Sequence, residues 1–75
     1  MEKVIDLRKP VYDICQAYPD AAAILAEVGF SEIAKPGMLT TVGRIMTIPK
    51  GTRMRGIKLE DVIAAFERNG YKVIQ

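Results

Sequence analysis

The side chain best suited to nucleophilic chemistry in this sequence is its single cysteine. A thiol becomes a good nucleophile when its pKa is depressed and a base lies beside it. Cys15 follows Val11 and Ile14 on the apolar stripe of an expected helix, and the 75-residue chain contains no histidine. Free cysteine is also among the residue types most often found buried. We therefore expect Cys15 to pack in the core and to have no catalytic role.

Two further patterns could do chemistry, and each has a simpler structural explanation. Glu60 and Asp61 are neighbours on an expected helix, so they point in different directions and stabilise its positive first turn. Met38, Met46 and Met54 recur every eight residues and could offer soft thioether ligands to a metal or haem. Methionine more commonly fills irregular gaps in small cores, and isolated thioethers are weak ligands. We expect no catalytic residue, no metal ion and no cofactor.

The feature that best indicates function is an acid-free segment. Residues 33–58 carry six basic side chains and no carboxylate, whereas residues 1–32 have a formal charge of −3 and residues 59–75 of −1. We expect a basic surface at residues 44–58 that binds an acidic protein, a second copy of the chain, or a small anion held at one of two helix starts. The candidate anion-binding or partner-binding residues are Arg44, Lys50, Arg53, Arg55 and Lys58.

Nucleotides and nucleic acids are weaker candidates for this segment. Lys50-Gly-Thr-Arg53 lacks the spaced glycines and the preceding strand of a phosphate-binding loop. The segment contains no aromatic residue that could stack on bases, and the net charge of the whole chain is only +2. Nucleic-acid binding is therefore disfavoured and stays a weaker alternative.

Short helices must position these residues. Apolar residues at helical spacing, bounded by proline and glycine, predict helices at residues 10–18, 19–28, 38–46, 47–54 and 59–68, with a single turn at 31–34. The helix at 38–46 has weak propensity, so we expect packing of its apolar side chains, among them Val42, Ile45 and Met46, to hold it.

The chain ends show a different pattern. Residues 3–7 and 71–74 alternate and predict a two-stranded ribbon that joins the ends of the chain. The predicted fold class is all-α: one domain at residues 1–75, with about five short helices in a compact cluster and this short ribbon.

The composition also bears on the compartment. The longest apolar run, at residues 21–26, is far shorter than the ~20 residues of a membrane span. The first residues lack the charge order of a signal peptide, and one cysteine cannot form an internal disulfide. We expect a cytoplasmic protein that does not bind membranes.

Several short motifs carry a family resemblance through their order and spacing. They are Val4-Ile-Asp-Leu, Tyr18-Pro-Asp-Ala, Leu25-Ala-Glu-Val-Gly-Phe30, Met46-Thr-Ile, Arg55-Gly-Ile-Lys-Leu59 and Asn69-Gly-Tyr71. Over nearly the whole chain this order resembles the family called domain of unknown function 1858. Many members are described as hybrid-cluster-protein-associated redox disulfide domains, and others stand alone or precede hemerythrin-like and sensor domains. The resemblance implies a small five-helix fold.

One departure limits what the resemblance implies. The redox members carry a pair of cysteines just after the glycine that ends the second helix, but residues 29–37 of this chain contain none. The redox-disulfide role therefore does not transfer. The chain is instead similar to a branch with Pro36-x-Met38 and Thr41-Val-Gly-Arg-x-Met-Thr47, for which the resemblance implies no established chemistry.

Two functional hypotheses follow. The first is a non-enzymatic interaction or regulatory module that presents the basic surface at residues 44–58 to an acidic protein partner, to itself or to an anion. The alternative, implied by the resemblance, is a ligand-binding or redox or metal-cofactor-binding domain linked to iron or nitrogen-oxide metabolism.

Overall fold

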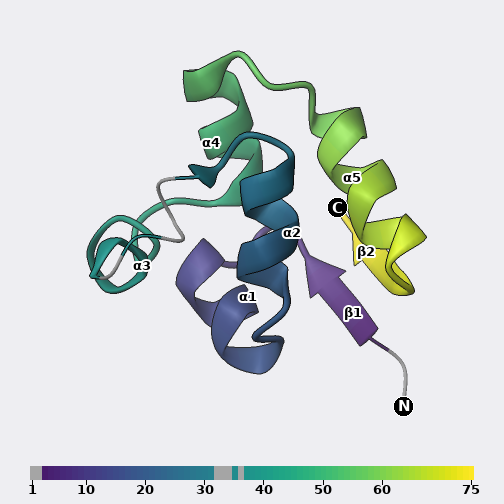
Figure 1. Ribbon diagram of the computed structural model, residues 1–75, viewed down its shortest axis with the longest axis horizontal. Helices are drawn as coiled ribbons and strands as arrows, with labels where there is room; N and C mark the ends of the chain where they lie inside the picture. Colours follow the sequence, from purple (N-terminus) through teal and green to yellow (C-terminus); the bar gives the residue numbers. More distant parts are fainter. Residues whose placement is uncertain (1–2, 32–34, 36) are drawn as a thin grey trace.

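Five short helices lie between two strands that pair the chain ends in the computed structural model, which describes residues 3–31, 35 and 37–75 (Figure 1). The elements, in order, are β1 (Lys3–Asp6), α1 (Val11–Ala17), α2 (Ala21–Glu27), α3 (Met38–Thr41), α4 (Ile48–Arg55), α5 (Leu59–Arg68) and β2 (Tyr71–Ile74). The predicted helical class with a short ribbon is confirmed. Within the described residues every helix is too short or too polar to cross a membrane. Most of the expected turn at 31–34 lies outside the described residues.

The two strands form a small parallel sheet. Lys3 lies opposite Tyr71, and Asp6 lies opposite Ile74. The ladder continues one step further, because the Leu7 N–H donates to the Ile74 carbonyl at 2.9 Å. Parallel pairing requires a crossover connection, and here all five helices lie on it. The predicted ribbon therefore forms and ties the first described residues to the last ones.

Prolines and a glycine bound the first two helices, close to the predicted positions. Pro10 is the N-cap of α1, and its ring holds φ at −59°. Tyr18 is extended, with φ −135° and ψ 94°, because the ring of Pro19 disfavours helical backbone at the preceding residue. After α2, Gly29 takes a φ of +121°, which suits glycine and ends the helical path.

The third helix is shorter than predicted. It ends at Thr41, and residues 42–45 form turns rather than a helix reaching residue 46. Residues of low helix propensity, Thr40, Thr41 and Gly43, lie where the helix ends. The turns that follow place two carbonyls against α1: the Val11 N–H donates to the Met46 carbonyl at 2.8 Å, and the Tyr12 N–H donates to the Gly43 carbonyl at 2.9 Å. The first N–H groups of α1 have no partner inside their own helix, so these carbonyls cap α1. The predicted extension to residue 46 is therefore wrong.

The last two helices lie close to the residues that capping residues and apolar spacing predict for them. The Thr47 hydroxyl accepts a hydrogen bond from the Lys50 N–H at 3.3 Å and so caps α4, which ends at Gly56 with φ +68°. In α5, Val62 and Phe66 face the core, as the apolar stripe predicts.

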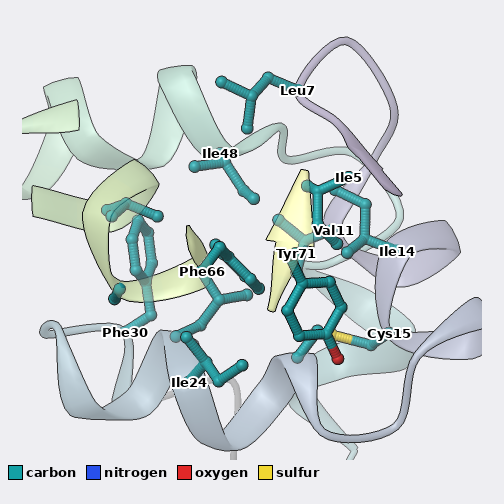
Figure 2. Close-up of a cluster of buried hydrophobic side chains, with 14 residues drawn as sticks. Ile5, Leu7, Val11, Ile14, Cys15, Ile24, Phe30, Ile48, Phe66 and Tyr71 are labelled. Atoms are coloured by element: carbon teal, nitrogen blue, oxygen red, sulfur yellow. The ribbon is translucent and has the colours of Figure 1, made fainter. Parts of the chain in front are cut away.

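Side chains from both chain ends and from the helices meet in one core (Figure 2). Ile5 of β1, Phe30 after α2 and Phe66 of α5 are among its largest fully buried members. The ring of Tyr71 packs edge-to-face against Phe66 and Tyr18, with centroids 5.4 and 5.3 Å apart. Because β2 contributes to this cluster, the ribbon is part of the core and not an appendage.

Candidate functional site

A shallow apolar hollow lies between the 42–46 loop and α4. Two of the large hydrophobic side chains that the described residues expose are found here: Ile45 is 77% exposed and Met54 is 73% exposed. The hollow has a volume of about 250 Å³ and is lined by Val42, Ile45, Met46, Lys50 and Met54. A neighbouring hollow of about 430 Å³ shares Val42, Met46 and Met54 and adds Arg55. We call the two together the apolar hollow.

The loop that forms one wall is held by the first turn of α1. The two backbone hydrogen bonds from Val11 and Tyr12 fix the carbonyls of Met46 and Gly43. Pro10 and Thr47 add an antiparallel bridge beside them. The wall is therefore positioned by backbone contacts, and the Ile45 side chain is left exposed to solvent.

The other wall is α4, and a glycine brings it close. Gly51 faces the core, where a Cβ would lie 2.5 Å from Cε1 of Phe30 and 2.9 Å from Sδ of Met46. Only a residue without a side chain permits this approach. The half-buried Met46 thus rests against α4 at Gly51 and forms the floor of the hollow.

Three of the predicted basic residues lie on α4, at or beside the apolar hollow. Lys50 and Met54 are four residues apart on α4, so they share a face, and Arg53 is next to both. Arg53 and Arg55 occupy the last turn, where the helix dipole stabilises positive charge. All three basic side chains are exposed.

The two remaining candidates lie at the edges of this region. The guanidinium carbon of Arg44 lies 4.8 Å from the ring centroid of Tyr12, which is a cation–π contact with α1. Lys58 is the N-cap residue of α5, beyond the turn that follows α4. The structure therefore places Lys50 and Arg55 in the lining of the apolar hollow and Arg53 on the same helix. Arg44 and Lys58 lie beside other elements.

Both helix starts in the acid-free segment offer little to a small anion. At the start of α4, Pro49 has no N–H, and the Lys50 N–H is taken by the Thr47 hydroxyl. At the start of α5, Glu60 and Asp61 place negative charge in the first turn. These local features make both helix starts poor sites for a small anion.

Cys15 is buried, as predicted. Its exposed fraction is 6%, and desolvation raises the pKa of its thiol to about 11. At neutral pH the group is therefore a protonated thiol in the core, in the same apolar cluster as Ile14 and Tyr71 (Figure 2). Such a group is a poor nucleophile.

The three regularly spaced methionines do not form one site. Met46 and Met54 both line the apolar hollow, whereas Met38 is half-buried at the start of α3. In the part of the chain that the structure describes, no three histidine, cysteine or acidic side chains gather in a way that could hold a metal ion.

Sequence reasoning missed the apolar part of the site. It assigned Val42 and Ile45 to a packed helix, but the chain leaves that helix at Thr41 and Ile45 points away from the core. The expectation that Ile45 packs is therefore wrong. The weak helix propensity of the segment was a local signal, but the hydrogen bonds that hold the following turns against α1 are long-range and do not show in the local pattern.

Two comparisons with known proteins give matches. The sequence matches the family described as Domain of unknown function (DUF1858) over residues 5–63. A solved structure, the crystal structure of a conserved domain protein from Streptococcus pneumoniae TIGR4, is 35% identical and superimposes with a TM-score of 0.93. That match covers 99% of this chain and 94% of the other. No curated protein matches the sequence.

Proposed function

This chain belongs to the DUF1858 family, whose function is unknown, and from that premise we propose that it is a non-enzymatic interaction module. Its basic surface at residues 44–58 binds an acidic protein partner. The observation that carries the proposal is the charge of residues 33–58, which hold six basic side chains and no acid.

The placement of the basic side chains supports binding rather than internal pairing. In the described ranges, no ion pair is formed by four of the basic residues, Arg44, Lys50, Arg53 and Lys58. The ion pair between Asp6 and Arg8 lies outside the acid-free segment. Exposed charges that are not neutralised by neighbours set up a positive potential, which speeds and orients the approach of an acidic surface. A function in association is what such a surface supports best.

The candidate reactive groups that the structure describes support a non-enzymatic role. The sequence has no histidine, and the Cys15 thiol is held protonated by its burial. The paired acids Glu60 and Asp61 lie in the first turn of α5, as predicted, and negative charge there is favourable to the helix dipole.

Reversal of charge on α4 tests the proposal. Lysate capture with the wild-type domain should retain a set of acidic proteins, and the double variant Lys50→Glu, Arg53→Glu should lose them. The matched control is Lys9→Glu, Arg68→Glu, which changes the net charge equally outside the acid-free segment and also reverses one arginine in a last helical turn. The control should retain the same proteins.

Other outcomes would redirect or end the proposal. An unchanged partner set with the α4 variant would remove the basic surface as the binding site. The wild-type domain could instead bind pyrophosphate or a DNA oligonucleotide saturably, with an affinity that falls with added salt and is lost in the α4 variant. That result would show that the basic surface binds an anion or a nucleic acid and not a protein. Colour or bound iron in the purified domain would instead support the cofactor-binding alternative.

A further inference from the structure

We infer that the apolar hollow receives a bulky aliphatic or aromatic side chain from an acidic segment of the partner protein. This inference rests on the proposed function and adds the chemistry of the partner's contact segment. Two exposed hydrophobic side chains on a 75-residue domain would be unremarkable if scattered, but Ile45 and Met54 line one hollow.

The shape of the site points to a side chain rather than an enclosed small molecule. The two parts of the hollow, of about 250 and 430 Å³, are both open to solvent, whereas a small-molecule pocket encloses most of the surface of its ligand. A site of this size suits one or two residues of a peptide. The neighbouring hollow at Arg55 gives room for the chain to continue along α4.

The charges around the hollow determine the partner's composition. Lys50 lines the lobe between Ile45 and Met54. Arg53 is exposed on the same helix, one residue before Met54. A peptide that places an apolar side chain in the hollow therefore brings its flanking residues next to positive charge. Carboxylates at those flanking positions complement the site, and basic residues there are repelled.

The site is also formed before the partner arrives. Its loop wall is held by backbone hydrogen bonds of 2.8 and 2.9 Å to α1, and Met46 rests against Gly51. Less conformational entropy is lost on binding when a site is already ordered, so even a short peptide gains useful affinity.

A second copy of this chain is a poorer occupant. The acidic residues Asp20 and Glu27 line a hollow with two bulky apolar side chains. These side chains, Ile24 and Tyr71, are 6% and 5% exposed, so they are buried in the core and cannot enter the apolar hollow of a second copy. The exposed Ile74 lies opposite Asp6 in the sheet, but the Asp6 carboxylate is already bonded to Arg8. An anionic membrane is also a poorer fit, because interfacial helices bury a broad apolar face, whereas the exposed side of α4 carries Met54 among basic residues.

Selection from a random dodecapeptide display library tests the inference directly. The wild-type domain should enrich acidic peptides that contain at least one bulky aliphatic or aromatic residue. Binding of an enriched peptide, measured by fluorescence anisotropy, should weaken at least about tenfold in the variant Ile45→Ser, Met54→Ser, because its apolar contacts are lost. The control Ile74→Ser removes an exposed hydrophobic side chain elsewhere and should bind like the wild type.

The outcomes separate this inference from the proposed function. Acidic peptides whose affinity falls in Lys50→Glu, Arg53→Glu but not in Ile45→Ser, Met54→Ser would overturn the inference and leave the proposed function standing. Enrichment of peptides without acidic residues would overturn both. The library could also yield no enriched peptide while the wild-type domain dimerises or binds phosphatidylserine vesicles. If the variant Ile45→Ser, Met54→Ser lost that dimer or that vesicle binding, the inference would be overturned. Circular dichroism of each variant shows that loss of binding is not loss of fold.

Discussion

Replacing Gly51 by alanine tests how tightly α4 is packed against the rest of the molecule. A Cβ at this position would lie 2.5 Å from Cε1 of Phe30, 3.1 Å from its Cζ and 2.9 Å from Sδ of Met46. Favourable contacts between carbon atoms lie at about 3.5–4.0 Å. Phe30 is only 1% exposed and is enclosed by the core, so its ring has little room to move.

Two opposing effects decide the sign of the change. Alanine is a better helix former than glycine by about 1 kcal/mol, which alone would stabilise α4. Forcing an extra methyl group into a packed site costs about 1–3 kcal/mol, and a contact as short as this one lies in the upper part of that range. We therefore expect Gly51→Ala to lower the free energy of unfolding by about 1–2 kcal/mol.

Urea unfolding followed by circular dichroism measures this loss. A destabilisation of this size should also lower the Tm of a domain of this length by about 4–8 °C per kcal/mol. The loss should shrink in a Phe30→Leu background, because the smaller side chain removes the clash. If Gly51→Ala were as stable as the wild type or more stable, the packing argument for Gly51 would be refuted.

Three further changes have defined outcomes. Burial raises the pKa of the Cys15 thiol from 9.0 to about 11, so the folded state favours the neutral thiol. The contribution of this neutral thiol to the free energy of unfolding is therefore present below pH 9 and lost as the pH rises to 11. Urea unfolding at several pH values should show this loss, and Cys15→Ala should remove part of it; an unchanged pH dependence would contradict the burial argument. Thr47→Ala removes the cap of α4 and should cost about 0.5–1 kcal/mol in guanidinium unfolding, and no loss would show that the cap is dispensable. Tyr18→Phe removes the hydroxyl that accepts a hydrogen bond from the Val4 N–H at 3.0 Å. We expect the free energy of unfolding to fall by about 1 kcal/mol and hydrogen exchange at the Val4 amide to become faster. Unchanged exchange would mean that water replaces the hydroxyl.

The helix boundaries that sequence reasoning located well depend on local chemistry. Pro10 and Pro19 restrict their own backbone and that of the residue before them, and Gly56 takes a positive φ that ends α4. The residues involved lie within one helical turn of the boundary that they set. Such signals act in any tertiary context, so they can be recognised without a structure.

The region between α3 and α4 could not be predicted in this way. Apolar residues at helical spacing indicated a helix to residue 46, but α1 needed partners for its first N–H groups and found them in the carbonyls of Gly43 and Met46. These partners are more than thirty residues away along the chain. The local pattern shows the weak helix propensity of the segment but not these distant partners.

In the candidate site, too, one property could be predicted from the sequence and another could not. Its charge was determined by the sequence alone, because six basic residues without an acid between residues 33 and 58 make a positive segment in any fold. The tertiary structure decided which of these residues gather around α4 and that Ile45 and Met54 line one hollow beside them. Net charge adds up along a chain, whereas exposure and proximity depend on which distant backbone groups pair, and only the folded molecule decides that pairing.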